Sequence, residues 1–392
     1  MMKVNDDLDF SKNIMSRFNE RLKNIGLNKF ELAHFQSGIS ELEKWGVLYI
    51  FYFFLKKNVF CNVGDIADSS DIQHALKIQP KYIKLLRCLL ELLVDFGCLK
   101  KIHGEIYEAA QVPLISTDYL NKVFDDIVKI YPEVIQSANF LKSVMSSYLK
   151  ILSGEVNFLN IMFPSGSLSI VEGLYRSSKD AAFFNTLVSS LVNEYADFYC
   201  SHDKNQVSII ELGAGVGSTT VSILPELASS GLCSNYAYTD ISKTFTRHGV
   251  SILNAGNYRF LDFFIFDINE EPGKQGVKRQ YDIVVATNVL HTAKDLLTTL
   301  NYVITLLKHG GLLIINEGVI KRDFSTLVYG FLDGWWAFED QKWRVSGSPV
   351  VCVDNWLKLL TLAGFENVFS VNRQFFLNEL DCQDIICGFK KI

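Results

Sequence analysis

A glycine-rich turn constrains this chain more than any other stretch of its sequence. The turn runs Glu211-Leu-Gly-Ala-Gly-Val-Gly-Ser-Thr219, directly after the apolar run Val207–Ile210 and before residues 220–227, which predict the start of a helix. The apolar run predicts a buried parallel strand. Glycine suits such a strand–turn–helix junction because the backbone must turn sharply and let a ligand approach without an intervening Cβ.

The spacing of the glycines indicates the kind of ligand. Gly213, Gly215 and Gly217 follow the pattern G-x-G-x-G behind the acidic Glu211, whereas dinucleotide-binding folds carry G-x-G-x-x-G. A carboxylate at the end of the strand repels a pyrophosphate and suits a ligand with a positively charged end. S-adenosyl-L-methionine (SAM) carries an ammonium and a sulfonium. The turn therefore predicts a SAM site, with S-adenosyl-L-homocysteine (SAH) as the product.

Further apolar runs in the second half of the chain also end in polar residues. Each run predicts a strand, and the runs alternate with helical segments, which favours right-handed βαβ units and a mostly parallel sheet. Ligands bind at the carboxyl ends of such strands. The polar residues predicted to lie at these ends are Glu211, Asp240, Asp267, His291 and Glu317. The second half is therefore expected to be a Rossmann-like α/β domain with one polar site.

The first part of the chain predicts helices followed by a hairpin. Helices are expected at residues 42–56, 65–76 and 81–96, and a hairpin at 98–107,. This pattern is typical of a winged helix. A winged helix serves either as a DNA-binding domain or as a lid or dimerisation module. The third helix mixes basic and acidic side chains, and the net charge of −5 is wrong for phosphate contacts,. We therefore expect two domains, a winged-helix-like lid or dimerisation domain at 1–160 and the Rossmann-like domain at 161–392.

Composition excludes several other classes of protein. The 392 residues are 48% hydrophobic, which is enough for a substantial core. The polar residues 1–13 do not form a signal peptide, and the longest apolar run, at 46–55, is too short to span a bilayer. Eight cysteines lie scattered without C-x-x-C pairs, which predicts no metal site. The expectation is a cytoplasmic protein without nucleic-acid or membrane partners, with homodimerisation left open.

Several motifs together resemble the methyltransferase domains of polyketide synthases. The resemblance covers roughly residues 115–392. The sequence shows no ketosynthase, reductase or carrier segment, so we expect a free-standing enzyme or a domain expressed alone. The matching stretches are residues 151–167, 172–176, 210–220, 238–242, Asn288-Val-Leu-His291, 310–317 and 330–336, with Ser348-Pro349 and Trp356 after them.

The resemblance and the strand ends together assign roles around SAM. The three glycines let the ligand approach the backbone, and Glu211 faces its amino-acid end directly or through water. Asp240 takes the ribose hydroxyls, and Asp267 accepts from the adenine amino group. The other expected contacts are Ile268 against the adenine ring, Tyr175 over the methionine end by resemblance alone, and Asn288. The alternative for Asp267 is a helix N-cap before Asn269 and Glu270.

His291 and Glu317 are the expected catalytic pair. In C-methylating members of the family the matched histidine removes a proton from the carbon between two carbonyls, and the matched glutamate orients it. A β-ketoacyl carbon is acidic enough for an imidazole base, and a neighbouring carboxylate fixes the tautomer and supports the cation. In the alternative, His291 caps the following helix and Glu317 pairs with Lys321 or Arg322.

These observations predict a SAM-dependent C-methyltransferase acting on the α-carbon of a β-ketoacyl thioester. An acyl carrier protein with a phosphopantetheine arm would present that substrate. The alternative is an O-methyltransferase acting on a hydroxyl or enol of a polyketide or other secondary metabolite. A non-catalytic module with the same fold is disfavoured by the intact glycines. The aromatic residues Trp335, Trp336 and Phe338 either line an acyl channel or pack against the sheet.

Overall fold

The computed structural model describes residues 5–26, 28–176, 178–203, 205–256, 258–375 and 382–391. It divides the chain into two compact units. The sheet unit comprises Met1–Lys29, Tyr175–Ile320 and Ala337–Ile392, and the helical unit comprises Phe30–Leu174 and Lys321–Trp336. The chain passes from the helical unit to the sheet unit at residue 175, whereas the domain boundary was expected at residue 160. Residues 1–29 belong to the sheet unit, although the helical unit follows them directly in sequence. Residues 321–336 belong to the helical unit, although they lie between two segments of the sheet unit.

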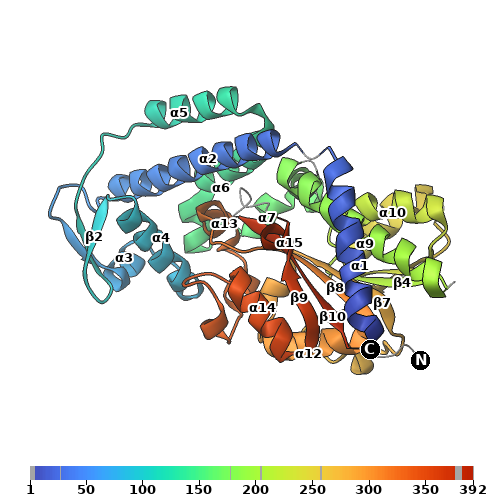
Figure 1. Cartoon of the computed structure of the whole chain (residues 1–392). Coiled ribbons are helices and arrows are strands. Elements are labelled where there is room, and N and C mark those ends of the chain that lie inside the picture. Colours follow the sequence, from blue (N-terminus) through green and yellow to red (C-terminus); the bar gives the residue numbers. More distant parts are fainter. Residues whose placement is uncertain are drawn as a thin grey trace. The chain divides into compact units, whose positions relative to one another are not determined.

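A seven-stranded sheet forms the centre of the sheet unit (Figure 1). Its order is β6-β5-β4-β7-β8-β10-β9, in which β4 to β8 run parallel and β10 is antiparallel to both of its neighbours. The expected Rossmann-like α/β class is confirmed. The strands are β4 Val207–Leu212, β5 Cys233–Asp240, β6 Leu261–Ile265, β7 Tyr281–Thr287, β8 Leu307–Gly318, β9 Phe365–Ser370 and β10 Gln383–Lys390.

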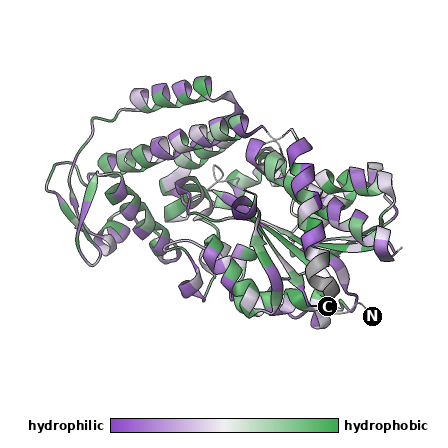
Figure 2. Ribbon diagram, in the orientation of Figure 1, coloured by the Kyte–Doolittle hydropathy of each residue, from purple (hydrophilic) through white to green (hydrophobic). Residues whose placement is uncertain are grey.

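Helices pack around this sheet, and Figure 2 shows its strands as largely hydrophobic ribbons. Parallel strands covered on both faces need such continuous apolar sequences. The buried core of β4, β7 and β8 includes Leu300 and Val303 of α12 and Leu359 of α14. The helices of the unit are α1 Asn5–Asn24, α9 Lys179–Asp203, α10 Ser218–Ser230, α11 Lys243–Leu253, α12 Leu296–Leu306, α14 Val353–Leu362 and α15 Val371–Gln374.

Two details of the strands differ from what their local sequence predicts. Lys308-His-Gly-Gly311 predicts the break of a helix, but β8 already begins at Leu307, with an irregular register opposite β7 and Gly310 at φ 74°. Residues 367–373 and 384–389 predict a closing hairpin, but β9 ends at Ser370 and α15 follows. The physical reason is a cap, because the Ser370 hydroxyl accepts a hydrogen bond from the Arg373 N–H,.

Ion pairs fasten the N-terminal helix α1 to the sheet unit. Arg17 pairs with Glu194 of α9 at 3.0 Å across 177 residues of sequence. Arg21 donates to Glu226 of α10 at 2.8 Å and to Glu194 at 3.4 Å. From the sequence, residues 1–29 are expected in the lid domain, since no local pattern reveals partners so distant along the chain.

The helical unit contains a three-stranded antiparallel sheet of order β1-β3-β2 beside three helices, as in a winged helix. The expected second helix begins later than Asp65, because Asp68 at the end of β1 caps α3 by accepting from the Ser70 N–H. The elements are α2 Lys29–Lys56, β1 Ile66–Asp68, α3 Ser69–Ala75, α4 Ile83–Asp95, β2 Leu99–His103, β3 Ile106–Ala109, α5 Thr117–Ile130, α6 Ile135–Ser153, α7 Phe158–Met162, α8 Ser169–Tyr175 and α13 Asp323–Tyr329.

The segment 321–336 follows β8 in sequence but packs with the helical unit. The Phe331 ring lies 5.5 Å from that of Tyr82, 4.7 Å from Tyr148 and 5.3 Å from Phe158. The Trp336 indole N–H donates to the Gly330 carbonyl at 2.8 Å. Phe331 therefore helps to build the core of the helical unit. Trp335 and Trp336 belong to the same unit, whereas Phe338 lies in the sheet unit.

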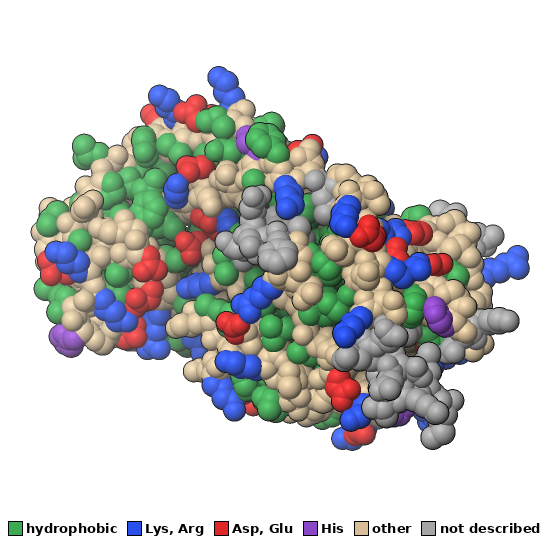
Figure 3. Space-filling model, in the orientation of Figure 1, with side chains coloured by type: hydrophobic (Ala, Val, Ile, Leu, Met, Phe, Trp, Pro, Cys, Tyr) green, Lys and Arg blue, Asp and Glu red, His purple; other side chains and the backbone are tan. Residues whose placement is uncertain are grey.

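Acidic and basic side chains are interspersed on the face of the molecule shown in Figure 3. Basic residues of the third expected helix, 81–96, have acidic neighbours: Arg87 lies 3.4 Å from Glu105, and Lys81 lies 3.9 Å from Asp333. This mixing supports the lid or dimerisation alternative over a DNA reader. Among the described helices, none is both long and apolar enough to cross a membrane.

Candidate active site

The glycine turn between β4 and α10 has the conformation that its sequence predicts. Gly213, Gly215 and Gly217 have φ values of 62°, 57° and 74°, in the left-handed region,. A Cβ on Gly213 would lie 2.3 Å from the Val289 side chain, whereas one on Gly215 would meet only the Gly213 carbonyl oxygen, at 3.9 Å. Gly213 is thus required for packing, whereas the space beside Gly215 is nearly free of protein atoms.

Asp240 lies at the carboxyl end of β5, against this turn. Its carboxylate accepts the Gly215 N–H at 3.0 Å and the Ser242 N–H at 2.8 Å. The residue is buried, and burial raises the pKa of its carboxyl group. The contact with Gly215 places Asp240 beside the open part of the turn, where the sequence analysis expected ribose hydroxyls.

Replacement of Asp240 by alanine should weaken SAM binding by about tenfold or more, because a charge-assisted hydrogen bond contributes about 1.5–3 kcal/mol. Isothermal titration calorimetry would measure the affinity. Asp262→Ala is a matched control, since Asp262 lies on the neighbouring β6 and accepts from Asn235 rather than from the turn. Unchanged affinity in the Asp240 variant would remove this residue from the SAM site.

Glu211 is the penultimate residue of β4 and is almost fully buried, at 1% exposure. One carboxylate oxygen accepts hydrogen bonds from the hydroxyls of Thr220 on α10 and Tyr236 on β5. Burial raises the pKa of the Glu211 carboxyl to about 7. The group is thus held between the sheet and α10, and the pH determines whether it carries the charge that was expected to attract the SAM ammonium.

Glu211→Gln should change how stability depends on pH. The unfolded chain ionises Glu211 near pH 4.5, whereas the folded protein keeps its proton to about pH 7. Between these values the folded state binds more protons, so this contribution to stability is lost as the pH rises. The free energy of unfolding of the variant should therefore improve relative to the unsubstituted protein by roughly 2–3 kcal/mol from pH 5 to pH 8. Urea denaturation of ligand-free protein tests this, and a difference independent of pH would contradict it.

The remaining residues expected around SAM lie in the same unit. Asp267 follows β6, and its carboxylate accepts the Asn269 N–H at 2.9 Å. This bond is the one that the capping alternative requires, although a 3-10 turn, η5 Pro272–Gln275, follows instead of an α-helix. Ile268 is buried in the core beside the sheet. Asn288 has φ 50° and donates its N–H to the Asn316 carbonyl at 2.8 Å, and Tyr175 ends α8.

His291 and Glu317 meet at the carboxyl ends of β7 and β8. His291 lies in the 3-10 turn η6 Leu290–Thr292, and its Nδ1 is 2.6 Å from Glu317 Oε2. The two strands are neighbours with Thr287 opposite Asn316, which brings the loop after β7 next to Glu317. The side chain of Glu317 is 1% exposed and that of His291 is 21% exposed. The carboxylate is thus shielded, while the imidazole retains access to its surroundings.

The second oxygen of Glu317 fixes the loop that carries the histidine. Oε1 accepts the N–H of Val289 at 2.8 Å and that of His291 at 3.3 Å. With Nδ1 donating to the carboxylate, the neutral ring presents Nε2 as its proton acceptor. In the alternative interpretation, His291 would cap the following helix and Glu317 would pair with Lys321 or Arg322. In the structure, Asp295 caps α12 and Arg322 pairs with Glu43 at 2.9 Å.

Val289 is a further part of this site, and the sequence alone predicted no role for it. Its side chain packs on Gly213, and its N–H bonds Glu317. It therefore connects the glycine turn to the histidine loop. The available signal was its place inside the motif Asn288-Val-Leu-His291, between two residues that were both assigned roles.

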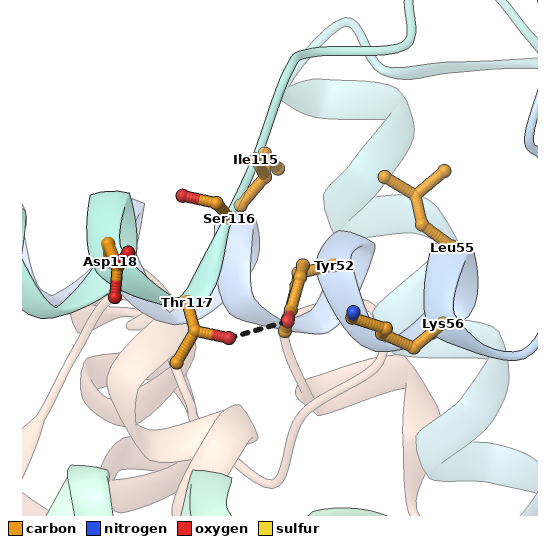
Figure 4. A pocket seen from close by; sticks show the side chains of 7 residues that line it. All are labelled: Tyr52, Leu55, Lys56, Ile115, Ser116, Thr117 and Asp118. Carbon is orange, nitrogen blue, oxygen red and sulfur yellow. Dashed lines mark hydrogen bonds between the residues drawn. The ribbon is translucent and has the colours of Figure 1, made fainter.

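A separate pocket of about 560 Å³ opens within the helical unit (Figure 4). Tyr52 of α2 and Thr117 of α5 share a hydrogen bond of 2.7 Å there, and the Lys56 amino group lies 5.3 Å from the centre of the Tyr52 ring. All the expected SAM and catalytic residues belong to the sheet unit. This pocket is thus distinct from the predicted active site.

The fold and the glycine turn agree with the comparisons to known proteins. Residues 210–313 match a family model described as a methyltransferase domain. The crystal structure of DszA carbon methyltransferase superposes with a TM-score of 0.85 at 28% identity over 92% of both chains. That of CurJ carbon methyltransferase gives 0.79 at 26% identity, covering 98% of this chain and 96% of the other. The protein is therefore a SAM-dependent methyltransferase.

The sequence relatives show to which SAM-dependent methyltransferases this chain is related. Polyketide synthase PksM of Bacillus subtilis (strain 168) is 32% identical over 298 residues, which is 75% of this chain. The chain is homologous to the methyltransferase regions of polyketide synthases, and it has the fold of carbon methyltransferase domains. It spans 7% of the length of PksM.

Proposed function

We propose that the protein methylates the α-carbon of a β-ketoacyl thioester in polyketide biosynthesis. The observation that carries this proposal is the bond between His291 and Glu317 at the strand ends beside the glycine turn. A carbon between two carbonyl groups loses a proton to a well-placed imidazole. The structural similarity to the DszA and CurJ carbon methyltransferases also supports carbon as the atom that is methylated.

The residues of the chain would act in the following way. His291 Nε2 takes the proton from the α-carbon as that C–H bond breaks, and the electron pair is delocalised as an enolate. Glu317 keeps the ring in the required tautomer and stabilises the imidazolium through Nδ1–H. SAM, when bound against the glycine turn, would supply an electrophilic methyl group. The enolate carbon forms the new carbon–carbon bond as the bond between sulfur and the methyl group breaks, and SAH remains as the second product.

An acyl carrier protein is the proposed source of the substrate. Polyketide synthases are the relatives of this chain, and a β-ketoacyl group would reach His291 on a phosphopantetheine arm. The same histidine could instead deprotonate a hydroxyl or enol, which would make the protein an O-methyltransferase. The position of the transferred methyl group separates the two functions.

The test uses SAM carrying a ¹³C methyl group with a β-ketoacyl pantetheine thioester or its β-hydroxy analogue. Mass spectrometry detects the methylated product, and ¹³C NMR shows whether the label is bonded to carbon or oxygen. We expect a carbon-bound methyl from the keto substrate alone, because the hydroxy analogue lacks the acidic carbon. An oxygen-bound methyl would overturn the proposal in favour of the O-methyltransferase.

A further inference from the structure

Arg344 is a buried cation whose hydrogen bonds surround the backbone of the histidine loop. Its side chain is 1% exposed. One terminal nitrogen donates to the His291 carbonyl at 2.6 Å and to the Pro349 carbonyl at 2.8 Å. The other donates to the Ala293 carbonyl at 2.7 Å. A planar guanidinium can serve several carbonyl groups in this way, which a lysine cannot reproduce.

Asp340 fixes the direction of this guanidinium. One of its oxygens accepts from Arg344 Nε at 2.7 Å, and the other accepts the Leu296 N–H at 2.8 Å. Leu296 is the first residue of α12, and the Asp340 side chain is 2% exposed. The pair therefore ties the turn that carries His291 to the start of α12 and to the segment around Pro349.

His291 is consequently held on both sides of its backbone. Glu317 accepts its N–H and contacts its ring Nδ1, and Arg344 binds its carbonyl. The turn η6 has only three residues, and such short 3-10 turns have poor internal hydrogen bonds,. External partners must therefore set the position of the ring and the direction in which Nε2 points.

We propose that Arg344, oriented by Asp340, is a positioning residue that aims His291 Nε2 at the substrate. This inference rests on the proposed role of His291 as the base. Arg344 is separated from the substrate by the histidine loop and acts through the backbone. Misplacement of a reacting group by about 1 Å costs about 100-fold in rate, so loss of the guanidinium should reduce proton abstraction without changing SAM affinity.

Exchange of the substrate α-proton for deuterium in the presence of SAH measures proton abstraction alone. Arg344→Met should lower the exchange rate by about 100-fold, with unchanged KM for the thioester and unchanged SAM affinity. Arg344→Lys keeps the charge and some hydrogen-bond donors, so its exchange rate should be about tenfold higher than that of Arg344→Met. Asp340→Asn combined with Arg344→Met avoids a buried unpaired carboxylate and serves if the single variant does not fold.

Lys308→Met is the matched control for a purely structural role. Lys308 pairs with the buried Asp282 at 2.8 Å, and Asp282 also accepts the Ser208 N–H, at the start of β4. This variant should lower thermal stability and leave exchange unchanged. If folded Arg344 variants exchange as fast as Lys308→Met, the inference is overturned.

His291→Ala separates this inference from the proposed function. Exchange that persists in His291→Ala would refute the histidine as base, whatever Arg344 does. If His291→Ala is inactive while the Arg344 variants exchange at the rate of the unsubstituted protein, only the positioning role fails. The inference is supported when His291→Ala is inactive and the rates rise from Arg344→Met through Arg344→Lys to the unsubstituted protein.

Discussion

His291→Ala should abolish methyl transfer and leave SAM binding intact. General-base catalysis contributes about 10²–10⁴-fold, so we expect a loss of roughly 1,000-fold in kcat. SAM affinity should persist because the glycine turn and Asp240 do not depend on the imidazole. Single-turnover transfer from ¹³C-labelled SAM and calorimetry measure the two properties.

His309→Ala provides the control for this experiment. His309 is exposed near the start of β8, far along the strand from Glu317, and its Nδ1 lies 2.9 Å from the Lys391 carbonyl. This variant should retain full activity. Full activity in His291→Ala would instead require another base and would refute the proposed mechanism.

Gly213→Ala should damage both the SAM site and the catalytic pair. Its Cβ would lie 2.3 Å from Val289 Cγ2 and 2.7 Å from Val289 Cβ, and the backbone φ of 62° is unfavourable for alanine. Valine is stiff at χ1, so the loop of Val289 must move. Overpacking costs about 1–3 kcal/mol, and the backbone strain adds about 1 kcal/mol. Because the Val289 N–H bonds Glu317, we expect loss of turnover together with loss of SAM affinity.

Gly215→Ala is the matched control for stability. It shares the positive φ, but its Cβ would meet only the Gly213 carbonyl oxygen, at 3.9 Å. In ligand-free protein it should therefore be the milder change, as urea denaturation would show. Val289→Ala should partly restore the stability of Gly213→Ala by removing the clashing methyl groups. Equal destabilisation by the two glycine variants would refute the packing argument.

The positions of the expected site residues follow from the local sequence. Short-range apolar runs predicted β4, β5, β7 and β8, and the carboxyl ends of neighbouring parallel strands meet at one edge of a sheet. His291 and Glu317 could be paired from sequence for this reason, as could Asp240 and the glycine turn. The alternation of strands and helices likewise predicted the α/β class.

Other features depend on partners that are distant in sequence. Ion pairs with α9 and α10 place α1 in the sheet unit, and ring contacts with Tyr148 and Phe158 place Phe331 in the helical unit. The 337–349 segment carries no motif that marks Arg344, whose bond to the His291 carbonyl joins residues 53 positions apart.

The sequence by itself therefore determined the class of fold, the glycine-rich turn and the contact between His291 and Glu317, the proposed catalytic pair. These features arise from local periodicity and from the rule that parallel strand ends converge. The tertiary structure alone decided which segments pack together and how the histidine loop is held. Those outcomes depend on side-chain contacts between remote segments, and the free energy of such contacts is set only when the whole chain has folded.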